Sequence, residues 1–436
     1  MPGSLQVDSD IRSLGRASKL EKLVHQVSDC SDESKLAVDH SARISAAVSF
    51  SGATNQGVAA LSFGGLQNLP TAPSPGAKTD LIWKVMRFPM QTEFRAIVQS
   101  EYGAPEKVLR IAKRQLKSEE LGADDVLVKV IARPIHPGDI QILSALPQGG
   151  PVEPIPEGTL RVPGFEGVGT ILGLGTNAKA AKRFSEGQRV AFFPANGTWG
   201  EYVVVRYNSL LPVPNEISDQ IAAQMLINTI TASVLIKAGH NSLKAPITLP
   251  VYILQNAAAS GVGRLLTQVA LDRGVRPIRL VRSNQSAERL QSALPGPPVY
   301  STSDSNWKEQ VREALGGHKL EVAFDAIGGK AIDDLAEVVD DGGTIINFGS
   351  LGSNTGTNIY SLTPNNVALR SVAIMSWFRL TEDEKRKDFE LALSLATNHP
   401  ELFEVGHEYD FSDFQQAIQR VSSPGKTGIV LLRSPV

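Results

Sequence analysis

The chain of 436 residues has one cysteine, little net charge and no long apolar run, and each of these shortages excludes a class of protein. A single cysteine, Cys30, excludes an internal disulfide framework and a cysteine-rich zinc site. The formal net charge of −2 gives no electrostatic footprint for nucleic acid or for an anionic membrane surface. No apolar run approaches the length that crosses a bilayer, so we expect no membrane span. With 42% apolar residues, the chain can still bury two cores, as a soluble enzyme does.

Residues 1–90 lack sustained helix or strand periodicity, apart from a short candidate helix near residues 18–26. They are rich in Ser, Ala, Gly and Asp, and we predict that they form a mostly disordered extension. Their acidic residues argue against a mitochondrial transit peptide, and an apolar signal core is missing. Met90 stands just before the first predicted strand, so an internal start stays open. We expect a cytoplasmic protein, with the mitochondrial matrix as the alternative.

The most informative stretch is an apolar strand over residues 251–255 that runs into a turn of small residues and then into an amphipathic segment. The apolar residues Leu265, Leu266 and Val269 recur at helical spacing, so a helix begins at this turn. Free amides at a helix N-terminus bind anions, and glycine lets a phosphate approach the backbone. We predict a pyrophosphate-binding turn made of Ser260, Gly261, Val262 and Gly263.

The next apolar strand, residues 277–281, ends at Arg282 and Ser283. This point lies about 20 residues past the glycines, where a dinucleotide fold contacts the adenosine ribose. No acidic residue between Arg276 and Ala287 could accept a hydrogen bond from a free 2′-hydroxyl, whereas an Arg beside a Ser suits a 2′-phosphate. We therefore predict that Arg282 and Ser283 bind NADPH rather than NADH; the alternative is that Arg282 is an exposed surface side chain.

Two further strands, residues 320–325 and 343–348, end in glycines and alternate with helical stretches. This pattern predicts a doubly wound parallel sheet, whose ligand lies beyond the carboxyl ends of its strands. Phe348, Gly349 and Ser350 should therefore lie beside the cofactor.

The remainder of the chain predicts a second domain. Short β-rich runs divided by Gly, Pro and Asn begin at Phe94, as in a partly closed barrel. A helix over residues 388–396 and a strand over residues 428–432 are expected to return to that barrel. We predict an α/β protein with a substrate domain over residues 91–213, a Rossmann domain over 214–370 and a return to the substrate domain over 371–436.

The order of these segments resembles the medium-chain dehydrogenase/reductase superfamily over residues 94–436, and implies a GroES-like barrel, a Rossmann domain and a homodimer. The chain looks most like the quinone oxidoreductases and the mitochondrial-type trans-2-enoyl-thioester reductases. The motifs that carry this likeness are residues 134–140, 162–167, 196–199 and 255–257, together with Trp377. The last three favour the enoyl reductases.

Zinc-dependent members of the superfamily bind their catalytic metal through a Cys in the loop matching residues 134–139 and a His before the Glu matching Glu166. This chain offers Ile135 or His136 and then Phe165, so the ligands are missing. A site built from His136, Asp139 and Glu166 is the alternative. We predict no metal, and we place His136 in a loop that packs near the cofactor and the substrate pocket.

The resemblance also implies a proton donor. In the enoyl-thioester reductases it is a Tyr, eight residues after the Asp that matches Asp139, and here that position is Pro147. Ser144 is a weak candidate for a hydrogen-bond donor, with a solvated or capping serine as the alternative. The catalytic residue therefore stays unknown. The absence of this Tyr favours quinone reduction, because water can protonate a reduced quinone oxygen.

Three more contacts follow from the resemblance. Asn228 matches an Asn that faces the cofactor, with capping of the helix that begins there as the alternative. Residues 373–377 match a segment that lines nicotinamide and substrate, which assigns Ile374 to the cofactor and Trp377 to the substrate pocket. Trp377 in the core is the alternative.

Three functions remain open. The first is an NADPH-dependent, zinc-independent reductase that transfers hydride to a quinone or an activated C=C bond, with a small-molecule electron acceptor as its partner. The second is a trans-2-enoyl-thioester reductase of fatty-acid synthesis. The third is a non-catalytic NADPH-binding protein.

Overall fold

The computed structural model describes residues 91–117, 121–145, 154–245, 247, 249–352, 356–423 and 425–435. The extension predicted for residues 1–90 lies outside the described residues, and so does Pro147. Within the described ranges, no helix is at once long enough and apolar enough to cross a bilayer.

Six strands form the sheet predicted for nucleotide binding, in the order β10-β9-β8-β11-β12-β13, and every neighbouring pair is parallel. Because the strands are parallel, the residues that follow β8, β9, β11 and β12 meet along one side of the sheet. We call this side the carboxyl rim; it comprises residues 256–260, 282–283, 326–329 and 348–350. The strands are β8 (Tyr252–Gln255), β9 (Arg276–Val281), β10 (Val299–Ser301), β11 (Val322–Asp325), β12 (Thr344–Asn347) and β13 (Ala368–Ser371).

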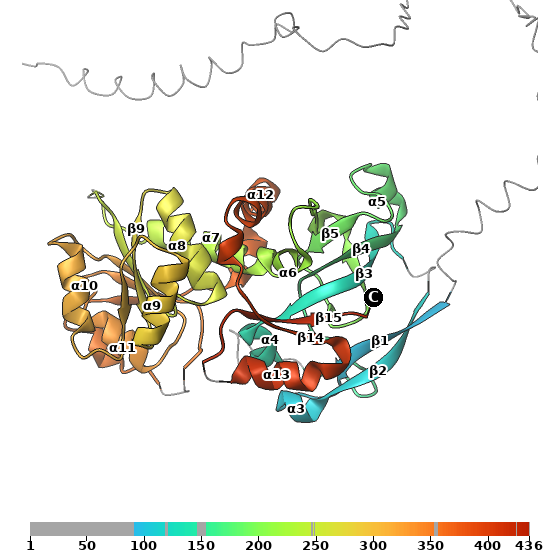
Figure 1. The fold of residues 1–436 in the computed structure, drawn as a ribbon, viewed down its shortest axis with the longest axis horizontal. Helices are drawn as coiled ribbons and strands as arrows, with labels where there is room; N and C mark the ends of the chain where they lie inside the picture. Colours follow the sequence, from blue (N-terminus) through green and yellow to red (C-terminus); the bar gives the residue numbers. More distant parts are fainter. Residues whose placement is uncertain are drawn as a thin grey trace, which may run out of the picture. The chain divides into compact units, whose positions relative to one another are not determined.

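Helices pack around this sheet, as the alternating pattern predicted (Figure 1). Helix α8 buries Leu265, Leu266 and Val269, the side chains whose spacing predicted it. The predicted helix over residues 388–396 is part of a longer one that begins after a capping box formed by Thr381 and Glu384. The helices are α6 (Asp219–Ala222), α7 (Met225–His240), α8 (Gly261–Asp272), α9 (Asn284–Ala293), α10 (Trp307–Leu315), α11 (Lys330–Ala336) and α12 (Glu382–Asn398).

A second sheet has the order β14-β15-β3-β4-β5-β7, with β6 also paired to β3. Strand β15, drawn in red in Figure 1, lies antiparallel to the cyan β3, so the last described strand joins the strands that precede the nucleotide sheet. The domain boundaries themselves stay a prediction. The strands are β3 (Asp125–Ile135), β4 (Gly167–Leu174), β5 (Arg189–Phe192), β6 (Tyr202–Arg206), β7 (Leu210–Pro212), β14 (Val405–Asp410) and β15 (Ile429–Arg433).

A two-stranded antiparallel sheet precedes them, formed by β1 (Gln91–Gln99) and β2 (Leu109–Lys117). Sequence reasoning found the first of these strands and missed the second, because four basic residues interrupt the alternation that marks a half-buried strand. Short helices connect the strands of this part of the chain: α3 (Pro105–Val108), α4 (Pro137–Leu143), α5 (Thr176–Ala180) and α13 (Phe414–Ser422).

A buried arginine ties the second sheet together. Arg133 of β3 is fully buried, and its guanidinium donates to the carbonyl oxygens of Thr198, Gly200 and Leu432 at 3.0, 2.8 and 3.2 Å. Burial lowers its pKa to about 9. The side chain thereby links β3, the loop before β6 and the last strand, three segments that are far apart in the sequence.

Candidate active site

The turn predicted to bind pyrophosphate lies at the carboxyl end of β8, in the middle of the nucleotide sheet. Ser260 is the N-cap of α8, and its Oγ accepts a hydrogen bond from the backbone N–H of Gly263 at 3.1 Å. The first turn of a 12-residue helix therefore faces the carboxyl rim with its partial positive charge. Val262 packs partly buried against the hydrophobic core.

The two glycines of the turn serve different purposes. A Cβ on Gly263 would lie 2.6 Å from the carbonyl oxygen of Ala257 and 2.8 Å from Cα of Ala258, so this glycine lets α8 pack against the end of its own strand. The sequence predicts only that this glycine lets a phosphate approach, and the structure adds this packing role. A Cβ on Gly261 would instead lie 3.0 Å from Nδ2 of Asn228, a side-chain atom.

Asn228 does not cap α7, so that alternative is wrong. The helix begins at Met225 with Gln224 as its N-cap, and Asn228 lies one turn inside it. Asn228 is buried, with 6% of its surface exposed, and its amide lies against the turn at Gly261. This position is compatible with the predicted cofactor contact, which stays a prediction.

Arg282 and Ser283 follow β9, the strand next to β8. Arg282 is exposed, and no hydrogen bond or ion pair joins it to another described residue. Ser283 is the N-cap of α9, where its Oγ accepts from the N–H of Ser286 at 3.3 Å. An exposed guanidinium beside a helix N-terminus is suited to a phosphate group.

Phe348, Gly349 and Ser350 follow β12 on the same rim. The N–H of Phe348 donates to the carbonyl oxygen of Asp325 at 2.8 Å. Ser350 is exposed, and its carbonyl oxygen accepts from Nε2 of Gln141 at 3.4 Å. Gln141 belongs to α4, so this contact joins the helix after β3 to the carboxyl rim.

Sequence reasoning missed a polar network beneath the rim. Asp325, the last residue of β11, is fully buried and accepts hydrogen bonds from Asn256 and Asn347, which follow or end the two neighbouring strands. The available signal was a carboxylate directly after three apolar strand residues, a position that requires buried hydrogen-bond donors.

His136 and Glu166 form a buried pair at the end of β3. His136 Nε2 and Glu166 Oε1 lie 2.6 Å apart, with side-chain exposures of 11% and 1%. The other carboxylate oxygen of Glu166 accepts from the N–H of Ile227 at 2.9 Å, in the first turn of α7. The N–H of His136 donates to Oδ2 of Asp139 at 2.8 Å. The three side chains thus join the barrel to the helix that carries Asn228.

The surroundings of this cluster raise the pKa values of His136 and Asp139. Burial lowers the pKa of His136, but the hydrogen bond to Glu166 and the charges of Glu166 and Asp139 outweigh it and raise that pKa. Burial raises the pKa of Asp139 to about 6, against the opposing effect of His136. A carboxyl group with a pKa of about 6 can exchange a proton under physiological conditions.

The remaining predicted residues lie in three places. Ser144 is the C-cap residue of α4. Ile374 begins the 3-10 helix η4 (Ile374–Arg379) and is partly buried against the core. Trp377 is only 3% exposed, with its ring stacked on Phe389 at a centroid distance of 5.9 Å. This packing favours a core role for Trp377, and its place in a substrate pocket stays a prediction.

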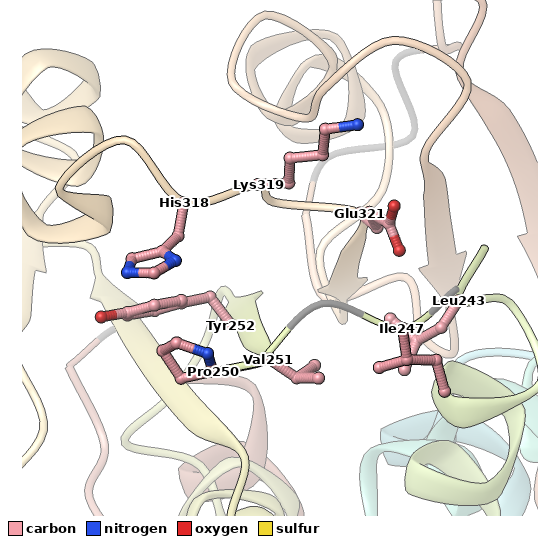
Figure 2. Close-up of a pocket in the computed structure, with 8 residues that line it drawn as sticks. All are labelled: Leu243, Ile247, Pro250, Val251, Tyr252, His318, Lys319 and Glu321. Atoms are coloured by element: carbon pink, nitrogen blue, oxygen red, sulfur yellow. The ribbon is translucent and has the colours of Figure 1, made fainter. Parts of the chain in front are cut away.

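A small hollow lies at the opposite, amino ends of β8 and β11. Its volume of about 30 Å³ is small beside the roughly 300–1,000 Å³ of ligand pockets, so it is no candidate for the cofactor site. Figure 2 shows His318 over the ring of Tyr252, and the two rings stack at 5.5 Å. Its lining residues are Leu243, Ile247, Pro250, Val251, Tyr252, His318, Lys319 and Glu321.

The residues of the rim fit a dinucleotide better than they fit a metal. A helix N-terminus, the glycines beside it and an exposed guanidinium after the adjacent strand, which no other described residue pairs with, suit the anionic groups of a dinucleotide. The described residues contain no group of three His, Cys, Asp or Glu side chains arranged to hold a metal ion. At the barrel loop, Ile135 and Phe165 contribute no ligand atoms.

Comparisons with known proteins agree with this geometry. The family model for the alcohol dehydrogenase GroES-like domain matches residues 122–215, and the model for zinc-binding dehydrogenases matches residues 261–398. The mitochondrial enoyl-[acyl-carrier-protein] reductase of Arabidopsis thaliana is 30% identical over 347 residues, which cover 78% of this chain and 87% of that protein. A Caenorhabditis elegans protein of the same name is 29% identical over 66% of this chain and 80% of its own length.

Solved structures show the same fold. A Bacillus thuringiensis protein described as an NADPH:quinone reductase aligns with a TM-score of 0.68 and 27% identity, over 79% of this chain and all of that one. A mycobacterial protein solved with NADPH aligns with a TM-score of 0.64 and 25% identity, over 78% of this chain and 99% of its own.

A GroES-like part joined to a parallel α/β sheet, with a glycine-containing turn and a helix N-terminus after an inner strand, is the fold of the dehydrogenases and reductases that this chain matches. The chain belongs to the medium-chain dehydrogenase/reductase superfamily, in the zinc-independent branch that contains the enoyl reductases and quinone oxidoreductases.

Proposed function

We propose that this protein is an NADPH-dependent, zinc-independent reductase that transfers hydride to a quinone or to an activated C=C bond. The observation that carries the proposal is the combination of the Ser260–Gly263 turn with Arg282, an exposed side chain after the adjacent strand β9 that no other described residue pairs with. The relatives support it, because a protein at 25% identity was solved with NADPH.

Each part of the rim has a task in this reaction. The amides of the turn hold the pyrophosphate, and Arg282 with Ser283 holds the 2′-phosphate. When bound, NADPH supplies the hydride. The loops at Gly349 and Ser350 hold the nicotinamide end, and α4 lies against them through Gln141. Reduction of a quinone needs no acid from the protein, since water can protonate the reduced oxygen.

An acceptor panel tests the proposal. The purified full chain should oxidise NADPH in the presence of quinones, enones or enoyl thioesters, with each acceptor omitted in turn as the control. Turnover of quinones with little turnover of thioesters would establish the quinone branch. Tight NADPH binding without turnover of any acceptor would instead support the non-catalytic protein.

The second candidate is a trans-2-enoyl-thioester reductase. The observation that favours it is the 30% identity to the Arabidopsis enoyl reductase over 87% of that protein. Against it stands Pro147 at the position of the family's Tyr. Turnover of crotonyl or hexenoyl thioesters, with a KM well below that for quinones, would select this candidate.

We also propose a homodimer. Strand β12 lies inside the nucleotide sheet, and β13 is its edge, with all four residues exposed. An exposed edge strand carries unpaired backbone groups, which a second copy could cover. Light scattering at micromolar concentration should give twice the chain mass, and a monomer mass would reject the dimer.

The cellular compartment of the protein is a further proposal, and two observations about it point in opposite directions. The acidic N-terminal residues favour the cytoplasm, whereas the enoyl reductases it resembles are named as mitochondrial. Imaging of the full chain with a fluorescent protein at its C-terminus, against a matrix marker, decides between the two.

A further inference from the structure

The carboxylate of Asp325 accepts four hydrogen bonds in a fully buried position. Oδ1 accepts from Nδ2 of Asn256 at 2.5 Å and from the N–H of Ile327 at 3.1 Å. Oδ2 accepts from the N–H of Gly328 at 2.9 Å and from Nδ2 of Asn347 at 2.6 Å. A buried carboxylate requires such a complete set of donors to remain charged.

These bonds connect three adjacent strands at the carboxyl rim. Asn256 directly follows β8, Asp325 ends β11 and Asn347 ends β12. Both asparagines make a second bond: Oδ1 of Asn256 accepts from the N–H of Ala326 at 2.8 Å, and Nδ2 of Asn347 donates to the carbonyl oxygen of Gly349 at 2.9 Å. Asp325 thus fixes the starts of both loops that leave the sheet on this side.

The two loops are also bonded to each other. The N–H groups of Leu351 and Gly352 donate to the carbonyl oxygens of Ala326 and Ile327 at 3.0 and 2.9 Å. A Cβ on Gly349 would lie 2.8 Å from the carbonyl oxygen of Ala326, so the loops approach as closely as a glycine permits. A change beneath one loop is therefore transmitted to the other.

We propose that Asp325 is the positioning residue of the nicotinamide side of the cofactor site, holding residues 326–329 and 348–350 at the spacing that the bound cofactor requires. The proposal rests on the NADPH site proposed above. Asp325 acts through the two loops, with Asn256 and Asn347 as its side-chain partners.

The chemistry of the network makes Asp325→Asn a strong test. An amide has one acceptor oxygen, whereas two donors point at each carboxylate oxygen of Asp325. Either orientation of the new amide therefore sets its NH2 against two existing donors. We expect D325N to weaken NADPH binding about tenfold and to speed amide hydrogen exchange at Gly328.

A double exchange should restore the network. In N256D/D325N, an oxygen of residue 256 accepts from the new amide at 325, while its second oxygen keeps the bond from the N–H of Ala326. The oxygen of the new amide keeps the bonds from Gly328 and Asn347, so only the 3.1 Å bond from Ile327 is lost. We expect this variant to bind NADPH within about threefold of the wild-type chain.

Asp388→Asn is the matched control. Asp388 is also buried, at 3% exposure, and its Oδ1 accepts from Oγ of Ser233 at 2.6 Å and from Nζ of Lys237 at 3.4 Å. It lies in α12, and among the described residues no hydrogen bond or ion pair joins it to the carboxyl rim. D388N should leave the dissociation constant of NADPH within about twofold, whatever it does to the melting temperature.

Fluorescence titration with NADPH and amide hydrogen exchange of the cofactor-free protein provide the readouts. The proposal is overturned if folded D325N binds NADPH as the wild type does, or if folded N256D/D325N binds it about tenfold more weakly. If neither variant is soluble, Asn347→Ala decides: it keeps the carboxylate but removes the bonds to Asp325 and Gly349. Binding weakened about threefold or more supports the proposal, and unchanged binding overturns it.

Failure of the proposed function has a different signature. A wild-type chain that does not bind NADPH rejects the reductase, and with it the role of Asp325 in cofactor binding. A wild-type chain that binds NADPH but reduces no acceptor rejects only the reductase, and the comparison of variants by titration still applies.

Discussion

Two polar clusters, one beneath the carboxyl rim of the nucleotide sheet and one at the barrel loop after β3, are built from different groups. At the nucleotide sheet, one carboxylate, Asp325, is surrounded by amide donors that do not titrate. At the barrel loop, His136, Asp139 and Glu166 are all titratable, and the pKa values of His136 and Asp139 are raised. The donors of the first cluster are amide groups with a fixed protonation state, whereas the second cluster contains two groups whose pKa values are shifted by their neighbours.

This difference indicates a division of labour. Cofactor geometry must stay constant through a reaction cycle, and backbone and carboxamide N–H groups keep their positions over a wide pH range. A site where protons move needs groups with pKa values near the working pH. In the barrel cluster, Asp139 has a pKa of about 6, and Glu166 bonds to α7, the helix whose Asn228 lies against the turn at Gly261.

The largest effect should come from removing the exposed charge of Arg282 at the carboxyl rim. Arg282→Ala removes a guanidinium that no described residue pairs with, and whose expected partner is the 2′-phosphate. A charge-assisted hydrogen bond contributes about 1.5–3 kcal/mol, so the KM for NADPH should rise roughly tenfold to a hundredfold. Steady-state kinetics with both cofactors measures it.

The KM for NADH serves as the internal control, because NADH lacks the 2′-phosphate. It should change by no more than about twofold in the same variant. Equal increases for the two cofactors would mean that Arg282 supports the fold rather than the phosphate.

A steric change tests the rigidity of the same side. Gly263→Ala places a Cβ against the backbone of Ala257 and Ala258, which cannot move aside without shifting the strand end. Overpacking of this kind costs about 1–3 kcal/mol, so the melting temperature should fall by several degrees. Calorimetry or fluorescence melting of the cofactor-free protein measures the loss.

Gly261→Ala is the matched control, two residues away in the same turn. Its new Cβ would meet only the side-chain amide of Asn228, at 3.0 Å. A flexible amide can yield, so G261A should melt closer to the wild type than G263A. The opposite order would show that the contact with Asn228 is the tighter constraint.

The nucleotide side and the barrel cluster also differ in how much of each was predicted from the sequence. The turn, β8 and α8 were predicted in place, because apolar periodicity and small residues are local signals. The family membership and fold class were likewise confirmed. Asp325 was predicted only as the last residue of a strand, since its partners Asn256 and Asn347 lie 69 and 22 residues away in the sequence. Spacing in the sequence gives no measure of contacts that parallel pairing creates.

The barrel cluster was predicted only as separate residues. His136 and Glu166 were weighed as metal ligands, but their hydrogen bond and the link from Glu166 to Ile227 depend on how β3 and α7 meet. Asn228 was assigned a cofactor contact or a cap, and the helix start at Met225 excluded the cap. Helix ends without an acidic or hydroxyl cap, such as Gln224, give no local signal.

A smaller effect, on the pH dependence of stability, should appear when Asp139 of the barrel cluster is replaced by Asn. The pKa of Asp139 is raised from 3.8 to about 6 in the folded chain. The folded state therefore binds more protons than the unfolded state over this range, and the stability so gained is complete below about pH 4 and lost as the pH rises through 6. Asp139→Asn cannot titrate and should lose less stability between about pH 4.5 and 7.5.

Urea unfolding of both proteins at the two pH values measures this difference. The charged and titratable groups facing Asp139 are His136, Glu166 and Arg161, with Lys426 acting on His136, and all of them remain in the variant. Ser144→Ala at the end of the same helix is the control and should keep the wild-type dependence. An identical pH dependence of D139N and wild type would remove Asp139 from the titrating cluster.

The smallest effect is expected from chelators, and it tests whether the barrel cluster is a metal site. His136 Nε2 is bonded to Glu166, whose second oxygen accepts from Ile227, while Asp139 accepts from the backbone of His136. These donor atoms already satisfy one another, and a zinc ion would have to break the bonds to collect three ligands. Elemental analysis should find no stoichiometric zinc, and a strong chelator should change NADPH oxidation by less than about twofold. One zinc per chain, lost together with activity on dialysis and recovered on adding zinc back, would show that the cluster is a metal centre.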